Sequence, residues 1–145
     1  MKNSTTHNEQ LHFTIPSQTQ YLHDVREFIT NAATTFGFNE DETHNIVLAV
    51  DEACTNIIEH SYQYAKDKKI VIDVFLKKNS LEIIITDTGK KFEPDTIPTP
   101  NLEEYIQQRK QGGLGLFLIK KIMDTVEFSF QENKNILRMV KHRSS

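Results

Sequence analysis

The sequence predicts one mixed α/β domain, because two kinds of hydrophobic periodicity alternate along its 145 residues. Three stretches carry apolar residues at helical spacing, and two pairs of short β-branched or alternating runs are typical of β-hairpins. The helical stretches are about residues 17–36, 39–62 and 113–123, and the strand runs are residues 70–76, 81–86, 126–130 and 136–140. A chain of this length buries roughly 68–70% of its unfolded surface, so we expect a core that needs no disulfide or metal.

The chain opens with a polar tail, residues 1–10, ahead of a domain that we place at residues 11–145. Residues 11–15 alternate between apolar and polar before a proline, a pattern that favours a short edge strand. Ser17 is predicted to cap the first helix, and Gly37 is predicted to end it. The domain therefore begins with a strand followed by an amphipathic helix.

The second helix is predicted to begin with a capping box. Asn39 supplies the cap, Glu42 completes the box, and the helical pattern continues to about Tyr62. Residues 88–112 show no strong periodicity, and loops of this length in compact domains are usually functional or disordered, so we interpret this one as a mobile lid. A last helix is predicted from Gly113 onward, before a closing hairpin whose turn we place at residues 132–135.

Composition and charge exclude several classes of protein. The single cysteine, Cys54, cannot form a disulfide framework or a Cys/His metal site, which favours a reducing, cytoplasmic setting. The formal charge of -3 and the pI near 6.1 come without a large basic patch, so nucleic acid is not an expected partner. No signal-peptide pattern is seen, and no stretch approaches the ~20 apolar residues of a membrane span, so we expect no membrane association.

Glu52 and Asn56 form the first candidate functional pair. They lie four residues apart on the second predicted helix, so their side chains project from one face, one turn apart. An amide oxygen is a suitable neutral ligand for Mg²⁺, and a neighbouring carboxylate can accept a proton from a nucleophile that attacks a phosphate. Taken alone, such a pair is more often a polar edge on a half-buried helix.

Asp87 and Gly89 form the second candidate, directly after a predicted strand. An ionised carboxylate there can accept a hydrogen bond from an exocyclic amine such as adenine N6, and glycine lets the backbone pass close to a flat ring. The alternative is an ordinary turn, since Asp and Gly are common at strand ends. The long predicted lid that follows favours a ligand site.

The third candidate is glycine-rich and opens the last predicted helix. It consists of Gly112, Gly113, Leu114, Gly115 and Leu116, and it holds three of the five glycines in the chain. Unpaired N–H groups and the positive end of the helix dipole attract phosphate at such a position. The segment has neither the GxxxxGK[ST] pattern of a P-loop nor the full dinucleotide fingerprint, so we expect a phosphate cradle of another kind. A hinge without a ligand is the alternative.

The three candidates together predict an ATP site. In chain order they supply a base with a magnesium ligand, an adenine acceptor and a phosphate cradle. Two cations precede the glycines, Arg109 and Lys110, and can steady the terminal phosphates when the lid closes. Charged loop residues are as often simply solvated, so both interpretations of this pair stay open.

The same residues resemble the nucleotide-binding boxes of the ATPase superfamily that contains gyrase, the heat-shock chaperones, the histidine kinases and MutL. Within that superfamily, the short form found in the anti-sigma-factor serine kinases is the more similar. The resemblance is carried by residues 50–56, His60, Tyr62, residues 113–119 and residues 123–124. It extends from the first predicted strand to the last hairpin.

The resemblance implies a Bergerat-type ATPase fold, a two-layer α/β (α+β) sandwich. In that fold, helices cover one face of a mixed, mostly antiparallel sheet, and ATP or ADP lies between a helix and the mobile lid. It also implies that Glu52 is the catalytic base, Asn56 the Mg²⁺ ligand, Asp87 the adenine contact, and Gly113 and Gly115 the phosphate-facing backbone.

The resemblance further implies two protein partners. One is a STAS-type antagonist of an anti-sigma factor, whose serine is the substrate, and the other is a sigma factor that is held inactive. Relatives of this kind also suggest a homodimer. One position departs from the family, which often has a second glycine two residues after Gly89, where this chain has Lys91. We expect a residue with a side chain there to restrict the backbone of the lid.

Two other functions stay open on the sequence alone. The first is a nucleotide-gated module that binds a partner without kinase turnover, which would follow if Lys91 impairs the motion of the lid. The second is the catalytic domain of a histidine kinase, because residues 23–26, beginning with His23, resemble a phosphoacceptor helix. The sequence shows no two-helix dimerisation hairpin, which disfavours the second.

Overall fold

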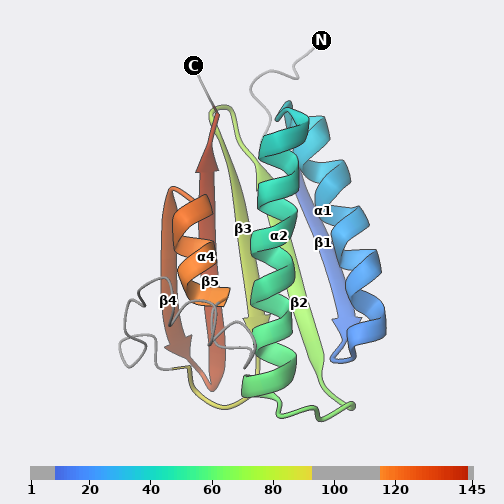
Figure 1. Cartoon of the computed structure of the whole chain (residues 1–145). Helices are drawn as coiled ribbons and strands as arrows, with labels where there is room; N and C mark the ends of the chain where they lie inside the picture. Colours follow the sequence, from blue (N-terminus) through green and yellow to red (C-terminus); the bar gives the residue numbers. More distant parts are fainter. Residues whose placement is uncertain (1–8, 93–114, 144–145) are drawn as a thin grey trace, which may run out of the picture.

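The computed structural model describes residues 9–92 and 115–143, and within these ranges a single sheet carries all the helices on the same face (Figure 1). The strands are β1 (Glu9–Pro16), β2 (Lys69–Leu76), β3 (Ser80–Asp87), β4 (Thr125–Gln131) and β5 (Lys134–His142). The helices are α1 (Leu22–Phe36), α2 (Glu40–Asn56) and α4 (Gly115–Ile122), with a 3₁₀ turn at Thr19–Tyr21 and a π-helical turn at Ile57–Ser61.

Every strand pair in the described sheet is antiparallel, and the strand order is β1-β2-β3-β5-β4. Every second residue of β2 is buried while the residues between are partly or fully exposed, as expected for a sheet with one covered face. The register places Val74 opposite Ile83, and Ile83 opposite Met139. All three side chains are 0% exposed, so the core runs without a break across the central strands.

The helices begin and end at local sequence signals. Asn39 Oδ1 accepts a hydrogen bond from the Glu42 amide at 2.8 Å, and Glu42 Oε1 accepts one from the Asn39 amide at 3.1 Å, which closes the predicted capping box. Gly37 ends α1 with a φ of 113°, a conformation that residues with a side chain rarely adopt. Arg26 on α1 donates to Asp51 on α2 at 2.7 Å. The Arg26–Asp51 contact joins α1 to α2, the helix that carries the first candidate pair.

The predicted two-layer α/β sandwich is confirmed, but the local prediction for Ser17 is wrong. Ser17 does not cap α1, because a 3₁₀ turn separates it from the helix. Its hydroxyl instead donates to the Ala65 carbonyl at 2.6 Å. Ser17 therefore binds a residue far away in the sequence, although the local pattern assigned its side chain to helix capping.

Some predictions fall on segments that lie outside the described residues. Most of the expected polar tail, residues 1–8, is among them, and β1 begins at Glu9. The predicted lid, residues 88–112, lies outside the described ranges from residue 93 onward. Within residues 9–92 and 115–143, no helix has the length and apolar character needed to cross a membrane.

Candidate functional site

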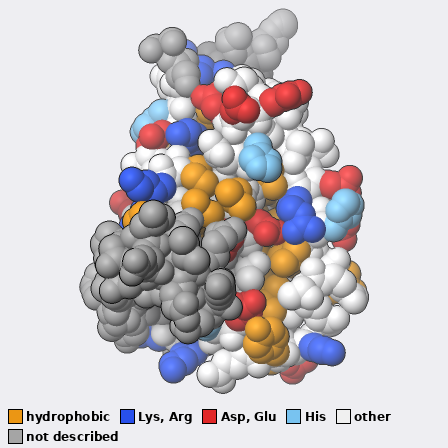
Figure 2. Space-filling model, viewed as in Figure 1, with side chains coloured by type: hydrophobic (Ala, Val, Ile, Leu, Met, Phe, Trp, Pro, Cys, Tyr) orange, Lys and Arg blue, Asp and Glu red, His pale blue; other side chains and the backbone are white. Residues whose placement is uncertain are grey.

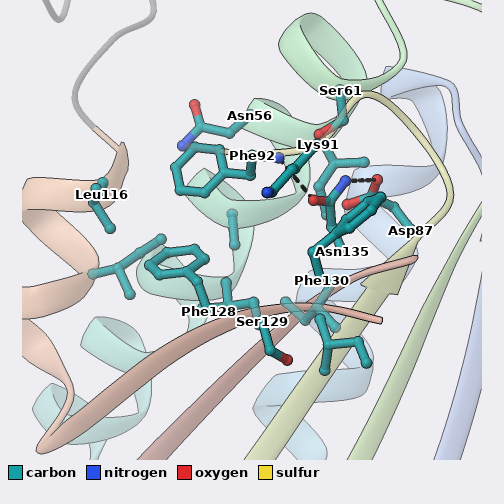
Figure 3. Close-up of a pocket in the computed structure, with 16 residues that line it drawn as sticks. Asn56, Ser61, Asp87, Lys91, Phe92, Leu116, Phe128, Ser129, Phe130 and Asn135 are labelled. Atoms are coloured by element: carbon teal, nitrogen blue, oxygen red, sulfur yellow. Dashed lines mark hydrogen bonds between the residues drawn. The ribbon is translucent and has the colours of Figure 1, made fainter. Parts of the chain in front are cut away.

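The helical face of the molecule carries a cavity of about 290 Å³ between α2, α4 and the strands β3, β5 and β4. On this face, hydrophobic side chains gather in the middle of the view with charged side chains around them (Figure 2). The lining residues are Ala53, Asn56, Ile57, Ser61, Ile85, Asp87, Lys91, Phe92, Leu116, Ile119, Phe128, Ser129, Phe130, Asn135, Ile136 and Leu137 (Figure 3). A mostly apolar interior with a few polar groups is the usual composition of a small-molecule site.

Asp87 is the buried carboxylate of this cavity. It ends β3, is 4% exposed, and accepts hydrogen bonds on Oδ1 from the Gly89 amide at 2.8 Å and from Asn135 Nδ2 at 3.0 Å. Burial raises the pKa of Asp87 above its usual value, while the hydrogen bonds from Asn135 and Gly89 act in the opposite direction. Both donors are neutral, so the carboxylate keeps its capacity to accept a hydrogen bond from a ligand amine.

Gly89 is required by a close approach of two backbone segments. A Cβ atom at this position would lie 2.4 Å from the carbonyl oxygen of Ser61, the last residue of the π-helical turn. The Lys90 amide donates to that same carbonyl at 2.9 Å, and the Thr88 amide donates to the Tyr62 hydroxyl at 2.9 Å. These contacts hold the turn after β3 against the π-helical turn that follows α2. Gly89 therefore has a structural role in addition to any role beside a flat ring.

Asn56 and Glu52 lie one turn apart near the end of α2, as their spacing predicts. Asn56 is half-buried and lines the cavity (Figure 3). Glu52 is also half-buried but is not among the lining residues. After Asn56 the helix continues as the π-helical turn, a distortion that is often found at functional sites. The structure therefore brings Asn56 to the same cavity as Asp87 and places Glu52 one turn back.

Two aromatic contacts join the segment after β3 to β4. The rings of Phe92 and Phe128 pack with their centroids 4.7 Å apart, and Lys91 Nζ lies 5.7 Å from the centroid of Phe130. All four residues line the cavity. Aromatic walls combined with a buried carboxylate suit a flat heteroaromatic ring that carries a donor amine.

The glycine-rich segment lies only partly within the described residues. Gly115 begins α4, and Leu116 is 5% exposed and lines the cavity. The start of α4 therefore shares the cavity with Asp87 and Asn56. The predicted site residues outside the described ranges are Arg109, Lys110, Gly112, Gly113 and Leu114.

Asn135 is a site residue that the sequence pattern assigns to a turn, and the structure corrects that assignment. It is the second residue of β5, is 7% exposed and contacts Asp87 directly. Its position in the sequence does carry a signal, because it has the inward phase of Leu137 and Met139. A polar residue at a core position of a strand indicates a specific hydrogen-bonding role.

A metal site made of protein side chains alone is not found: within residues 9–92 and 115–143, no three His, Cys, Asp or Glu side chains converge. Mg²⁺ commonly takes one or two protein oxygens and completes its shell with water and substrate phosphates. Asn56 supplies a suitable amide oxygen at the cavity wall. The residues present therefore fit Mg²⁺ that binds together with a nucleotide.

The chain matches a family model and is similar to several named proteins. Residues 15–141 match the family model of the histidine kinase-like ATPase domain. The chain is 33% identical over 137 residues to the serine-protein kinase RsbW of Halalkalibacterium halodurans, which covers 92% of this chain and 83% of that protein. It is 32% identical over 131 residues to the serine-protein kinase RsbW of Bacillus subtilis, which covers 87% of this chain and 79% of that protein.

A solved structure supports the fold independently of the sequence. The structure contains the RsbU and RsbW domains of a Mycobacterium tuberculosis protein, and it matches 94% of this chain with a TM-score of 0.66 at 16% identity. This chain spans 34% of that longer chain. At this identity, the similarity bears on the arrangement of helices and strands alone.

Proposed function

This chain belongs to the family of histidine kinase-like ATPase domains, and its relatives include proteins named serine-protein kinase RsbW. From that premise we propose that it is an ATP-dependent protein serine kinase. The family resemblance inferred from the sequence is confirmed, and membership implies ATP binding. The observation that carries the proposal is the convergence of Asp87, Asn56 and the start of α4 on one cavity.

We assign recognition of the adenine base to Asp87. Its carboxylate is buried, is positioned by neutral donors, and lines a cavity with several apolar walls, where a hydrogen bond to a ligand amine competes less with water than it would on an exposed surface. Adenine N6 is such an amine, and Phe92 and Phe128 offer aromatic surface on which the ring can pack. The cavity is therefore suited to ATP and ADP more than to a nucleotide with a carbonyl at that ring position.

We assign the phosphate end of the nucleotide to α2, α4 and the glycine-rich segment. Asn56 would hold Mg²⁺, which when bound neutralises charge on the phosphates. The backbone N–H groups of Gly112, Gly113, Leu114, Gly115 and Leu116 would donate to phosphate oxygens at the helix terminus. Arg109 and Lys110 would contact the terminal phosphate.

We assign the role of general base to Glu52. In the proposed reaction, a serine hydroxyl oxygen forms a bond to the γ-phosphorus of ATP while the bond from that phosphorus to the β,γ-bridging oxygen breaks. The hydroxyl proton passes to the Glu52 carboxylate, and ADP leaves. Because Glu52 lies one turn from Asn56 on α2, the base and the metal-binding oxygen are carried by one rigid element.

The proposed protein partners follow from the family. We propose that the serine belongs to a STAS-type antagonist and that the chain also binds and inactivates a sigma factor, as a homodimer in the cytoplasm. The chain covers 83% and 79% of the length of two serine-protein kinases that it resembles, which supports carrying their activity over to it.

The kinase proposal is tested by mixing the protein with Mg-ATP and its STAS-type antagonist and measuring phosphoserine by mass spectrometry. Glu52→Gln is expected to slow transfer by roughly 10²-fold or more with little change in ATP affinity, because only the proton acceptor is lost. Asn56→Ala is expected to weaken Mg-ATP binding itself. Glu40→Gln, at the exposed start of the same helix, serves as the control. Unchanged transfer by Glu52→Gln would overturn the assigned base.

The contact of Lys91 with Phe130 favours a second candidate function. If this contact keeps the segment after β3 against β4, the protein can bind nucleotide and present a surface to a partner without transferring phosphate. Capture of a partner that requires ATP, with no phosphate on the antagonist, would select this nucleotide-gated module.

The histidine-kinase hypothesis has less support. His23 is exposed on α1, where its Nε2 lies 3.3 Å from Glu27, and the residues lining the described cavity include none from α1. Acid-labile phosphate on His23 after incubation with ATP would be the observation in its favour.

A further inference from the structure

Asn135 connects two parts of the cavity that are distant in sequence. The register of β3 and β5 places Asn135 opposite Asp87, and its Nδ2 donates to Asp87 Oδ1 at 3.0 Å. The same Nδ2 donates to the Lys90 carbonyl at 2.8 Å, and Asn135 Oδ1 accepts from the Phe92 amide at 2.8 Å. One buried amide therefore joins the carboxylate to the segment that follows it (Figure 3).

These contacts fix which way the amide of Asn135 points. Its nitrogen faces a carboxylate and a carbonyl, both of which only accept, and its oxygen faces an N–H group, which only donates. A flipped amide would place oxygen against oxygen at two positions. No other side chain of similar size offers two donors and an acceptor in this fork, so the residue type is specified by its surroundings.

The first consequence concerns the direction of the Asp87 carboxylate. The Gly89 amide and Asn135 Nδ2 both donate to Oδ1, and no hydrogen bond within residues 9–92 and 115–143 uses Oδ2. Two donors on one oxygen fix the rotation of the carboxylate about its last torsion angle. The second oxygen is thereby held ready for a ligand.

The second consequence concerns the cavity wall. Asn135 holds the backbone at Lys90 and Phe92, and this backbone carries the Lys91 side chain to Phe130 and the Phe92 ring to Phe128. The aromatic wall therefore depends on the same amide as the carboxylate does. Loss of that amide would loosen both together.

We propose that Asn135 is a positioning residue for nucleotide recognition, which aims the Asp87 carboxylate at the base and holds residues 89–92 as a wall of the same cavity. The proposal rests on the proposed function, because it takes the ligand to be an adenine nucleotide. It goes beyond that function by assigning selectivity for the base to a residue outside the three sequence motifs.

The test compares ATP with inosine triphosphate, which carries a carbonyl where adenine has its amine, on the wild type, Asn135→Ala and Asn135→Asp by titration calorimetry in magnesium. The wild type is expected to prefer ATP, and Asn135→Ala is expected to reduce that preference about tenfold, mainly by weakening ATP. Asn135→Asp, which keeps the shape but replaces the donor with an acceptor, is expected to reduce it at least as far. Asn133→Ala and Asn133→Asp, in the exposed turn before β5, are the matched controls.

A local measurement separates positioning from general loss of structure. In Asn135→Ala, hydrogen exchange of the Phe92 amide is expected to accelerate, because that amide loses its acceptor, while exchange at Ile85 in β3 stays slow. A variant that weakens both nucleotides equally, or that leaves Phe92 exchange unchanged, would overturn the proposal and leave the kinase assignment standing. A wild-type protein that binds neither nucleotide would overturn the proposed function and this inference with it.

Discussion

Two buried carboxylates lie on the same strand, β3, and they are stabilised in opposite ways. Glu82 is 7% exposed and is paired with Lys77 at 2.9 Å and with Arg138. Burial alone would raise the pKa of Glu82, but the hydrogen bonds and charges of Lys77 and Arg138 lower it below the usual value. Asp87 is 4% exposed and has neutral donors, and burial leaves its pKa raised.

The difference between the two carboxylates indicates that Glu82 serves the structure, whereas Asp87 is suited to bind a ligand. The charge of Glu82 is already compensated within the chain, so a ligand would gain little by approaching it. The charge of Asp87 is oriented but not compensated, which is unfavourable for the empty protein and favourable for binding a donor group. The comparison predicts that a substitution at Asp87 lowers nucleotide affinity without lowering stability, whereas a substitution at Glu82 lowers stability without changing nucleotide affinity.

The largest effect is expected from Asp87→Asn. Nucleotide affinity should fall roughly 100-fold, because the variant no longer presents a charged acceptor to the ligand amine. Stability at neutral pH should stay equal or rise. The raised pKa of Asp87 means that its contribution to stability is complete below the unfolded value near 3.8 and is lost as the pH rises through the folded value. The neutral amide avoids that loss and can still accept from Gly89 and Asn135.

Calorimetry with ATP and thermal unfolding at neutral pH check both halves of this prediction. A variant that binds ATP as tightly as the wild type, or that melts well below it, would show that Asp87 is a structural carboxylate like Glu82.

The next effect is expected from Gly89→Ala. The new Cβ would meet the Ser61 backbone at 2.4 Å, so the turn after β3 must move, at a cost of about 1–3 kcal/mol and a roughly tenfold loss of ATP affinity. Gly37→Ala, whose strain comes from a φ of 113°, should cost about 1 kcal/mol and leave ATP affinity unchanged. Urea unfolding and ATP titration of both variants give the comparison, and an equal loss of affinity in both would refute it.

A smaller effect on stability alone is expected from Glu82→Gln. The free energy of unfolding at neutral pH should fall by about 1–2 kcal/mol. The loss is no larger because the Lys77 and Arg138 side chains are 41% and 38% exposed, so water screens their interaction with Glu82. Since the pKa of Glu82 is lowered, its contribution is present above the unfolded value of 4.5 and is lost as the pH falls through the folded value. Denaturant unfolding at neutral pH and below pH 4.5 should therefore show the variant and the wild type converging in acid. A change in ATP affinity would be unexpected.

The smallest effect is expected at Cys54. It is 0% exposed, and burial, with a further contribution from Asp51, raises the pKa of its thiol to about 12. The folded protein should therefore resist alkylation by iodoacetamide, while the protein in denaturant should be labelled. Rapid labelling of the folded protein at neutral pH would show that α2 opens locally.

Local signals in the sequence predicted the features of the fold that depend on neighbouring residues. The capping box of Asn39 and Glu42 forms as expected, Gly37 ends α1, and the hairpin of β2 and β3 has nearly the predicted limits. The spacing of Glu52 and Asn56 likewise fixed their relation, because both lie on one helix. Periodicity and capping are sufficient where the partner is within a few residues.

Contacts between distant segments could not be predicted in the same way. Ser17 bonds to Ala65, the bare backbone of Gly89 fits against Ser61, and Asn135 pairs with Asp87 through the register of two strands. Each contact depends on how elements pack, which a local pattern does not encode. The candidate motifs were therefore predicted from the sequence, whereas Asn135, which contacts Asp87, was not.

The central claim is that the cavity beside Asp87 binds the adenine base. It is tested most directly by following the amide NMR spectrum during titration with Mg-ATP and, separately, with inosine triphosphate. We predict that ATP shifts the backbone amides of Gly89 and Phe92 and the side-chain amide of Asn135, and that inosine triphosphate does so much less at the same concentration. Unchanged signals at these three groups when ATP has saturated the protein would contradict the claim.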